Sequence, residues 1–479
     1  MNVDVLVVGG GPAGLSAALE LRRLGVGSVL VADREAAAGG VPRHSFHTGY
    51  GLRDRHRVMT GPAYARALAS AALAAGAELR LGTTVTGLTR GSGVSGVSGG
   101  GSVTLTSASG IETVQAAAVL LATGCRERPR TARLVPGDRP TGVMTTGELQ
   151  QRVYLSGERL VGRAVVVGAE HVSFSAAVTL EHAGARVVAL VTEHARQQSY
   201  AAFRLGAALR WRIPVWAGCA VQRIVGRGVA GPGVADSGAA GGEATGGERL
   251  AGGRERLAGV EVADVRTGAA RFVPCETVVF TGDWIPDHEL ARLAGLTMDP
   301  GTRGPAVDTA LATSAAGVFA AGNLVHAAET ADIAALSGRH AARHIAAALS
   351  GAGLPVAGPS GAGPSGAGPS GAGLGSAASA GLGSAASAGP RLPVLVAPPL
   401  RWISPNVIGT PAAPPPLGRF VLRSADFRRA ARLEVRQDGR LLARSRPVRL
   451  IPERPVHLNG GWLARVDPAG GPIRVTTAP

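Results

Sequence analysis

The chain has 479 residues, of which 45% are hydrophobic, and this is enough for the cores of two or three domains. It contains no run of about 18 uninterrupted apolar residues, and its apolar start lacks a basic leader, so neither a membrane-spanning helix nor a signal peptide is expected. The formal net charge is +16, but lysine is absent and the arginines are dispersed, which argues against a nucleic-acid-binding protein.

The first predicted element is an N-terminal β-strand that leads through a glycine-rich turn into a helix. The turn has the spacing G-x-G-x-x-G, formed by Gly9, Gly11 and Gly14, and the next predicted strand ends at Asp33. In dinucleotide-binding folds such glycines permit the turn, the approach of a diphosphate and the packing of helix on strand, while the acid binds a ribose hydroxyl. The sequence therefore predicts a dinucleotide site at Gly9, Gly11, Ala13, Gly14 and Asp33. A glycine-rich loop without a ligand would leave Asp33 unexplained.

The following elements continue an α/β pattern. A helix is predicted over residues 62–75, because an N-terminal proline precedes an alanine-rich segment that ends at a glycine. Alternating residues at 78–90 and 102–116 predict antiparallel strands joined by a Gly/Ser-rich tip at 91–101. The apolar run 118–124 predicts another buried strand, which ends in a Thr-Gly pair.

A second strand–helix–strand unit begins at Arg163. Its helix is expected to run to His182, and its second strand ends at the acidic Glu193. Residues 228–255 are rich in glycine and alanine and predict an expanded surface loop. The apolar run 278–283 is expected to close this unit.

The rest of the chain changes composition twice. A strand and turn are predicted at 317–323, followed by a long helix over 329–349. Residues 351–390 repeat Gly-Pro-Ser-Gly-Ala and Gly-Leu-Gly-Ser-Ala-Ala-Ser-Ala, a composition that predicts a flexible linker. Residues 391–479 carry short β-like runs and many prolines, and 437–440 is a hairpin signal, so a small all-β domain is expected.

The order of these features resembles the two-dinucleotide-domain flavoprotein oxidoreductases, which are relatives of the pyridine nucleotide–disulfide oxidoreductases. The stretches ATGCRERP and GVMTTG are closer to one branch, which includes the FAD subunits of sarcosine oxidase, opine oxidase and hydrogen cyanide synthase. The resemblance covers roughly residues 1–350 and implies an α/β fold with two Rossmann-like domains, the second inserted in the first. The expected domains are an FAD-binding domain over 1–150 and 280–350, an NAD(P)-binding-like domain over 151–279, a linker over 351–390, and a small β domain over 391–479.

The resemblance also implies which residues would hold FAD. The first glycine loop and Asp33 would bind the ADP half, and Val85 would lie near the adenine through its backbone. Asn323 stands where the family usually has an aspartate that binds the ribityl hydroxyls. The helix that begins near Glu329 would point its positive end at the N1–C2=O edge of the flavin. The full expected set is Gly9, Gly11, Ala13, Gly14, Asp33, Gly40, Val85, Thr123, Gly124, Gly322 and Asn323.

One departure from the family concerns the cysteines. Disulfide reductases of this kind carry a C-x2-C or C-x4-C pair beside the flavin, whereas Cys125, Cys219 and Cys275 are far apart in the chain. Disulfide chemistry at the flavin is therefore not expected. Scattered cysteines without a disulfide framework suit a reducing, cytoplasmic setting.

A second departure lies in the second glycine fingerprint, where Gly168 remains but Glu170 and Ser173 replace the other two glycines. A carboxylate where a diphosphate must approach the backbone is expected to weaken nicotinamide binding, unless Glu170 caps the following helix or Arg196 neutralises it. Glu193 would suit the ribose of NAD and disfavour the 2′-phosphate of NADP. The sequence thus leaves NAD binding through Gly168 and Glu193 open, and favours it over NADP.

Candidate catalytic residues follow a Gly-Gly pair in the first domain. An arginine such as Arg43 can hold a carboxylate or phosphate, and His44 or His47 can take a proton as hydride leaves a C–H bond. The alternative is that this cluster only seals a pocket or pairs with the diphosphate. His340 and His344 have helical spacing but lack a third ligand, so no metal site is expected.

The expected function is that of an FAD-dependent oxidoreductase that transfers a hydride through flavin N5. One side of the transfer is a small-molecule substrate, and the other is NADH or an electron-accepting partner, either a partner subunit or a quinone. The alternative is a non-catalytic flavin-binding subunit of a multi-subunit dehydrogenase or oxidase.

Overall fold

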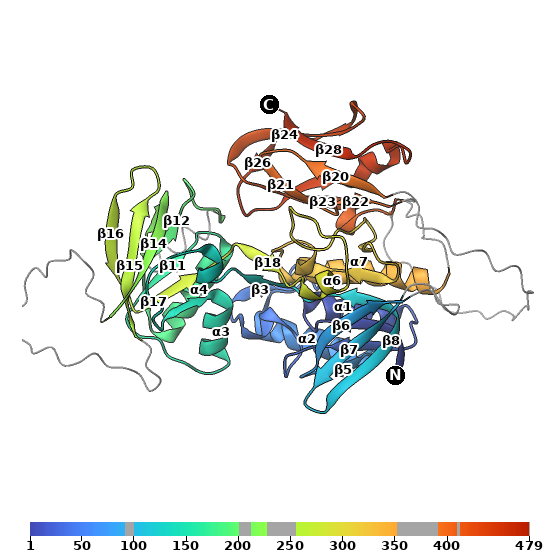
Figure 1. The fold of residues 1–479 in the computed structure, drawn as a ribbon, viewed down its shortest axis with the longest axis horizontal. Coiled ribbons are helices and arrows are strands. Elements are labelled where there is room, and N and C mark those ends of the chain that lie inside the picture. Colours follow the sequence, from blue (N-terminus) through green and yellow to red (C-terminus); the bar gives the residue numbers. More distant parts are fainter. Residues whose placement is uncertain (92–99, 201–211, 228–254, 352–390, 410–411, 479) are drawn as a thin grey trace, which may run out of the picture.

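The computed structural model describes residues 1–91, 100–200, 212–227, 255–351, 391–409 and 412–478. These residues form three parts that lie against one another (Figure 1). The first part is built from both the N-terminal segment and residues that follow the second part, and the C-terminal part lies across the other two. Residues 352–390 of the linker expected over 351–390, and residues 228–254 of the surface loop expected over 228–255, lie outside the described residues.

The first part contains a seven-stranded sheet in the order β5-β2-β1-β8-β7-β6, with β19 also paired to β8. Strands β5, β2, β1, β8 and β19 are parallel, as expected for strands joined by helices, and β6 and β7 form an antiparallel extension. Its strands are β1 (Asn2–Val8), β2 (Val29–Ala32), β5 (Glu78–Arg80), β6 (Thr84–Arg90), β7 (Gly101–Ser107), β8 (Gly110–Leu121) and β19 (Val318–Ala320).

Helices cover this sheet. Helices α1 and α7 lie side by side, and the Cβ that Gly338 lacks would stand 2.0 Å from the carbonyl oxygen of Ala13. The small residue therefore lets the two helices approach closely. The helices and minor elements of this part are α1 (Pro12–Arg23), the 3-10 turn η1 (Val41–His44), β3 (Thr48–Tyr50), β4 (Met59–Thr60), α2 (Gly61–Ala74), α6 (Glu289–Leu293), η4 (Gly322–Leu324) and α7 (Ala331–Leu349). The 3-10 turn η2 (Arg130–Arg133) belongs to the second part, where Arg133 donates to the carbonyl oxygens of Thr281 and Gly282.

Two expected strands are each divided in the structure. The strand predicted over 78–90 is divided into β5 and β6, and β5 is parallel to β2. The predicted strand over 102–116 is divided between β7 and β8, which form a hairpin that turns at residues 108–109. The buried positions change from odd numbers in β7 (Val103, Leu105) to even numbers in β8 (Val114, Ala116), so the alternation breaks at the turn, after which Gly110, with φ of +118°, begins the second strand. The predicted helix over 62–75 is present as α2, shifted by one residue at each end.

The second part holds a parallel five-stranded sheet in the order β10-β17-β11-β12-β13 and an antiparallel sheet β14-β15-β16. A two-stranded ribbon, β9 with β18, connects it to the first part. Its elements are β9 (Cys125–Glu127), β10 (Val143–Thr145), α3 (Thr146–Tyr154), β11 (Arg163–Val167), α4 (His171–Ala183), β12 (Arg186–Thr192), β13 (Val215–Ala217), β14 (Cys219–Gly226), β15 (Leu257–Asp264), β16 (Ala270–Pro274), β17 (Thr277–Phe280) and β18 (Trp284–Pro286).

The C-terminal part is all β, with a six-stranded and a three-stranded sheet around a shared apolar core. The expected hairpin is present, with Asp438 (φ 47°) and Gly439 (φ 80°) as its two turn residues. Its elements are β20 (Leu392–Val396), β21 (Leu400–Ser404), β22 (Val407–Ile408), the 3-10 turns η5 (Pro416–Gly418) and η6 (Gly460–Arg465), β23 (Arg419–Ser424), β24 (Arg428–Gln437), β25 (Arg440–Arg444), β26 (Val448–Leu450), β27 (Val456–Asn459) and β28 (Ile473–Ala478).

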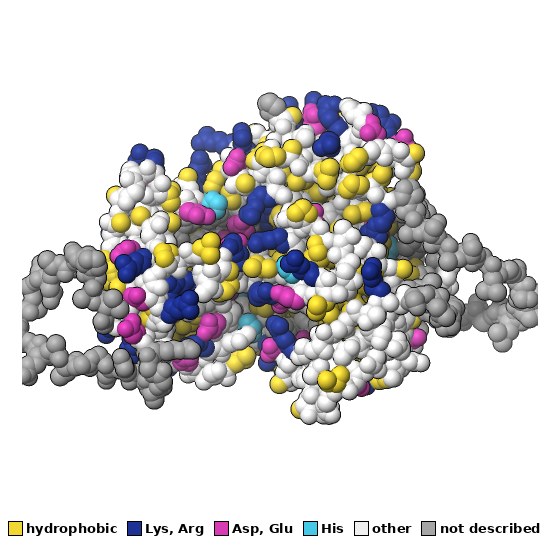
Figure 2. Space-filling model, in the orientation of Figure 1, with side chains coloured by type: hydrophobic (Ala, Val, Ile, Leu, Met, Phe, Trp, Pro, Cys, Tyr) yellow, Lys and Arg dark blue, Asp and Glu magenta, His cyan; other side chains and the backbone are white. Residues whose placement is uncertain are grey.

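Polar contacts fasten the C-terminal part to the first part. Asn406 accepts a bond from the backbone N–H of Val307 at 2.9 Å, and its own backbone N–H donates to the Val307 carbonyl at 3.2 Å. Arg391 donates to the carbonyl oxygens of Ala312 and Thr313. On the face seen in Figure 2, basic side chains are spread among acidic ones, and several lie together where the three parts meet.

Candidate functional site

The first glycine loop joins β1 to α1, and two of its glycines are required by packing. Gly9 has φ of +108°, and a Cβ there would stand 2.5 Å from the carbonyl oxygen of Ala122. A Cβ at Gly14 would stand 1.9 Å from the carbonyl oxygen of Gly9, so α1 can lie on β1 only with glycine at this position.

Gly11 is different, because a Cβ there would meet only the Cα of Gly40, at 4.0 Å. A side chain at Gly11 would thus clash with no protein atom. No acidic side chain occupies the first turn of α1, and no side chain caps its free N–H groups. This combination fits a diphosphate, which the N–H groups and the positive end of the helix would hold.

The expected adenosine end of the site is also assembled. Asp33 follows β2 and accepts hydrogen bonds from the backbone N–H groups of Gly10 at 2.5 Å and Glu35 at 2.8 Å. The carbonyl of Asp33 accepts from the N–H of Thr83 at 2.9 Å, which brings the start of β6 and the half-buried Val85 alongside. A carboxylate has further lone pairs, so Asp33 keeps the capacity to accept from a ribose hydroxyl.

Asn323 is held in a two-way hydrogen bond with the backbone of Glu329. Its Oδ1 accepts from the Glu329 N–H at 2.9 Å, and its Nδ2 donates to the Glu329 carbonyl at 3.1 Å. An aspartate, the residue usual in the family, has no N–H to donate to that carbonyl. The departure from aspartate therefore has a local reason, and the loop before α7 depends on the amide.

Three further residues that are expected to bind FAD lie at the ends of β8 and β19. Thr123 donates to the carbonyl oxygen of Asp287 at 2.7 Å, and the carbonyl of Gly124 accepts from the Asp287 N–H at 2.9 Å. Gly322 has φ of +69°, and its N–H donates to the hydroxyl of Ser337 at 2.8 Å. The structure thus gathers these three residues at one edge of the first sheet.

The long helix begins two residues later than expected, at Ala331, with two carboxylates beside its N-terminus. Asp332 is 3% exposed and pairs with Arg53 at 3.2 Å. Glu329 is also buried and pairs with Arg423 at 3.4 Å; burial raises the pKa of this carboxyl group. The positive end of α7 thus lies beside two carboxylates, each of which is paired with an arginine.

The candidate catalytic residues lie on and after η1, next to the first glycine loop. Arg43 lies 3.5 Å from Glu35. His44 is buried, and burial lowers its pKa, so its imidazole is neutral at pH 7. His47 is exposed, its Nδ1 lies 2.9 Å from the Thr48 carbonyl, and its ring stacks on Tyr50. Their catalytic roles stay predictions.

The second fingerprint lies at the switch point of its sheet, where β11 is flanked by β12 on one side and β17 on the other. This crevice is where dinucleotides bind in such sheets. Glu170 fills it: the carboxylate accepts a 2.5 Å hydrogen bond from Thr281 after β17, and it is 9% exposed. A Cβ added to Gly168 or Gly282 would stand within 2.7 Å and 2.8 Å of the two carboxylate oxygens.

Glu170 also forms a capping box with Ser173 at the start of α4, one of the two alternatives that the sequence leaves open. The Glu170 side chain remains in the crevice while it forms this capping box. Arg196, which the other alternative would place beside Glu170, lies over the ring of Phe427. Glu193 is exposed after β12. A nicotinamide dinucleotide does not fit this loop as it stands, because its diphosphate would meet a buried carboxylate.

Most of the chain matches a known protein family. The family described as pyridine nucleotide-disulphide oxidoreductase matches residues 3–338. The chain belongs to this family. Members of this family bind FAD and use NAD(P)H. The loop at Gly11 fits the diphosphate of FAD. At the second loop, the carboxylate of Glu170 lies where the diphosphate of NAD(P)H would approach.

Two proteins that are named as enzyme subunits are similar to part of this chain. The hydrogen cyanide synthase subunit HcnB of Pseudomonas aeruginosa is 31% identical over 192 residues, 39% of this chain and 38% of that protein. An opine oxidase subunit of Agrobacterium tumefaciens is 32% identical over 189 residues, 38% of this chain and 35% of that protein. The matches span little more than a third of each relative's length.

Solved structures share the fold. Thioredoxin reductase of T. acidophilum superposes with a TM-score of 0.56 and 21% identity, covering 72% of this chain and 98% of that one. The bacillithiol disulfide reductase of Bacillus cereus gives 0.53 and 17%, covering 72% and 99%. These likenesses confirm the predicted α/β fold of the two-dinucleotide type.

The cysteines of this family member do not form a redox pair. Cys125, Cys219 and Cys275 are all free, and burial raises the pKa of the Cys125 and Cys275 thiols. Thiols of this kind are poor nucleophiles. The described residues include no group of side chains suited to a metal ion, and none of their helices is long and apolar enough to cross a bilayer.

Sequence reasoning missed two residues of the site. Gly338 permits the contact between α1 and α7, and the run of small residues in that helix could have indicated it. Arg423 of β23 donates to the carbonyl oxygen of Ala328, in the segment before α7, at 2.7 Å. No local pattern marks Arg423, because its role depends on how the C-terminal part docks.

Proposed function

We propose that this chain is the FAD-carrying subunit of a multi-subunit oxidoreductase that takes a hydride from a small molecule. Electrons would then leave to a partner subunit or a quinone rather than arrive from NADH. Two similar proteins are named as subunits, which supports a partnered enzyme. The three free thiols suit the cytoplasm as its compartment.

The observation that carries this proposal is the position of Glu170. Its carboxylate is buried in the crevice of the second sheet, bonded to Thr281, and burial raises its pKa. Entry of a dinucleotide would require this side chain to leave its capping box and its hydrogen bond. The first loop has no such obstruction at Gly11. The chain is therefore built to hold FAD and to resist reduction by a nicotinamide dinucleotide.

The residues of the first part define what the protein contributes. Bound FAD supplies hydride acceptance and release at N5. Gly11 and the N-terminus of α1 would hold the diphosphate, and Asp33 the adenosine ribose. Among the residues near this loop, the buried neutral His44 is able to accept a proton as a C–H bond is broken, and Arg43 to hold a substrate anion.

Anaerobic titration tests the electron route. FAD-loaded wild type, Glu170→Gly and Glu193→Gln are mixed with NADH or NADPH, and flavin absorbance is followed. We expect slow reduction of the wild type, and at subsaturating NADH a reduction at least about tenfold faster in Glu170→Gly, the equivalent of about 1.4 kcal/mol. Glu193→Gln, which leaves the crevice filled, should remain as slow as the wild type. Rapid reduction of the wild type by NADH would refute the proposal.

The same preparation separates the catalytic reading from a non-catalytic flavin-binding subunit. Dithionite should reduce the bound FAD, and the reduced protein should pass electrons to an artificial dye acceptor. A reduced protein that gives no electrons to the dye, although it retains FAD, favours the non-catalytic subunit.

A further inference from the structure

The first turn of α7 lies beside the first turn of α1, next to the first glycine loop. A Cβ added to Gly322 would stand 2.8 Å from the Cβ of Ala13 in α1 and 3.7 Å from the Cβ of Ala334 in α7. The positive ends of the two helices therefore lie close together. The end of α1 would hold the diphosphate of FAD, and the family resemblance places the N1–C2=O edge of the flavin at the end of α7. Charges in the first turn of α7 are thus positioned to act on the flavin.

Asp332 places a buried carboxylate in that first turn. Its side chain is 3% exposed, and its Oδ1 accepts hydrogen bonds from the backbone N–H of Ile333 at 3.0 Å and from the hydroxyl of Thr330. A carboxylate at this position stabilises the helix, but it also cancels part of the positive potential that the helix end offers to an anionic ligand. Because the carboxylate is buried, solvent ions screen its charge only weakly.

Arg53, in the turn after β3, is the cation that pairs with Asp332. Its backbone N–H and its terminal nitrogen Nη1 each donate to Oδ2 of Asp332 at 3.2 Å. Nη1 also donates to Oδ1 and to the Thr330 hydroxyl, both at 3.4 Å. Arg53 follows the candidate catalytic residues His44 and His47 in the chain, so this ion pair also fastens their segment to α7.

The acids next to this ion pair have arginines of their own. Asp54, whose side chain is fully buried, lies 3.7 Å from Arg339, which is on the same helix as Asp332. Glu329, just before α7, lies 3.4 Å from Arg423 of the C-terminal part. Each carboxylate near the start of α7 is thus paired with a different guanidinium group, and the loss of one arginine would leave one carboxylate without its counter-charge.

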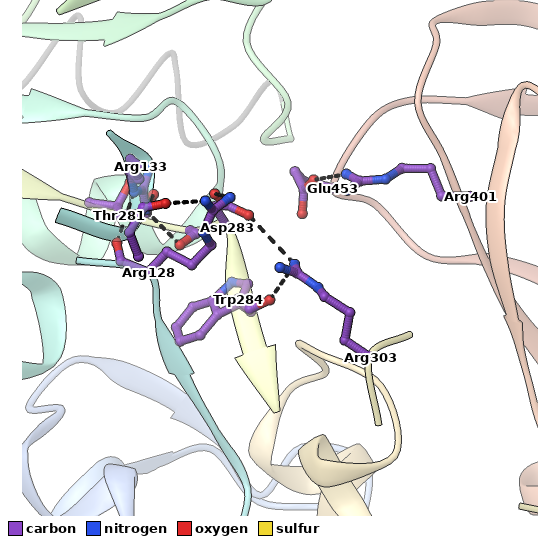
Figure 3. Close-up of polar contacts among 10 residues, drawn as sticks. Arg128, Arg133, Thr281, Asp283, Trp284, Arg303, Arg401 and Glu453 are labelled. Carbon is purple, nitrogen blue, oxygen red and sulfur yellow. Dashed lines mark hydrogen bonds and ion pairs between the residues drawn. The ribbon is translucent and has the colours of Figure 1, made fainter. Parts of the chain in front are cut away.

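The charged groups at the junction of the three parts are also paired among themselves. These pairs are Arg303 with Asp283 at 3.6 Å and Arg401 with Glu453 at 3.4 Å (Figure 3). Within the part of the chain that the structure describes, the ion pair of Asp332 is made with Arg53. A substitution of Arg53 should therefore change the charge at the start of α7 without rearranging the pairs at the junction.

We propose that Arg53 is a positioning residue that raises the reduction potential of bound FAD by neutralising the carboxylate of Asp332. Hydride addition to FAD leaves a negative charge at the N1–C2=O edge, and an unpaired carboxylate nearby would oppose that charge. With Arg53 in place, the positive end of α7 keeps its effect on the flavin. The inference rests on the proposed function, because it requires FAD at the first loop, and it adds a residue that controls how readily the flavin accepts a hydride.

The test is the midpoint potential of the flavin in the full-length, FAD-loaded protein, measured against reference dyes. Arg53→Gln should shift the equilibrium about tenfold toward oxidised FAD, a potential about 30 mV lower for a two-electron couple. Asp332→Asn should shift it in the opposite direction, because the unpaired arginine then attracts the added charge. The double variant, which lacks both charges, and Arg53→Lys, which keeps the positive charge, should both stay close to the wild type. A merely structural role of the pair would not give shifts of opposite sign.

Arg343→Gln is the matched control, because Arg343 lies on the same helix and pairs with Glu20 at 2.8 Å, but about 16 Å farther along the helix axis than Asp332. Its flavin should have the potential of the wild type. If Arg53→Gln does not retain FAD, Asp332→Asn carries the test. Unchanged potentials in the variants that retain FAD, or shifts of the same sign in Arg53→Gln and Asp332→Asn, would overturn this inference alone. A folded wild type that takes up no FAD would refute the proposed function and this inference with it.

Discussion

Gly11 shows how one residue can be irrelevant to packing and essential to binding. The two other glycines of the loop have no room for a side chain, but a Cβ at Gly11 would touch nothing closer than 4.0 Å. We therefore predict that Gly11→Val loses FAD and folds with a melting temperature close to that of the FAD-free wild type. Absorbance of the purified protein and released flavin measure the loss. Gly461→Val, also in open space but far along the chain, should retain FAD.

Asn323 supports a prediction about stability. Asn323→Asp keeps the size of the side chain but removes the N–H that donates to the Glu329 carbonyl at 3.1 Å. Two oxygens would then face each other in a half-buried loop, at a cost of about 1 to 3 kcal/mol. Urea unfolding of the FAD-free protein measures the difference. Equal stability of variant and wild type would show that the loop before α7 does not depend on this amide.

Arg423 and Glu170 show which site residues a sequence can and cannot disclose. Glu170 breaks a fingerprint whose spacing is visible in the chain, so its conflict with a diphosphate was predictable, although its bond to Thr281, 111 positions away, was not. Arg423 carries no such mark. Its environment exists only because β23 docks on a segment 95 positions earlier.

At the scale of elements, Glu127 connects β9 to α3. It is 6% exposed, and the N–H of Gly147 in the first turn of α3 donates to it at 2.9 Å. Burial, with a smaller contribution from the nearby Glu170, raises the pKa of Glu127 to about 7. The folded protein thus holds this proton at pH values at which the unfolded chain has released it.

This shift predicts a pH dependence. Between the unfolded pKa of 4.5 and the folded pKa of about 7, the native state binds more protons than the unfolded state, so the stability due to Glu127 falls as the pH rises. The loss amounts to at most about 3 kcal/mol. Glu127→Gln should remove this slope, which denaturant unfolding from pH 5 to 8 measures against the wild type. An identical slope in both proteins contradicts the prediction.

Elements with a local signal were predictable, and those defined by long-range pairing were not. The β1–α1 turn, the helix α2 and the Asp438–Gly439 hairpin each carry turn or capping residues in place. The division of 102–116 into β7 and β8 also has a local signal, because the alternation changes phase at the Ser-Ala-Ser-Gly of 107–110, and the prediction missed it. The pairing of β9 with β18 joins residues about 160 positions apart and could come only from the resemblance.

At the scale of the whole molecule, the C-terminal part is predicted to stay attached without a covalent connection. A specific protease site placed within residues 351–390 allows it to be cut from the rest. The paired bonds between Asn406 and Val307, together with Arg391 and Arg423, should keep both pieces together on gel filtration. Asn406→Leu should weaken this association. Two separate peaks from the cut wild type would contradict the prediction.

The C-terminal part touches the second part as well as the first. Phe427 lies between His194 and Arg196, and Arg454 covers the ring of Tyr200 at 3.7 Å. In mechanical terms, the β9–β18 ribbon is the hinge between the first and second parts, and the C-terminal part contacts both of them across this hinge. A rotation of the second part about this hinge would have to break the contacts that the C-terminal part makes with the first part and with the second part. We therefore expect the oxidised and reduced proteins to give the same small-angle scattering curve. An electron-accepting partner would then have to approach the flavin directly, without a rotation of the second part.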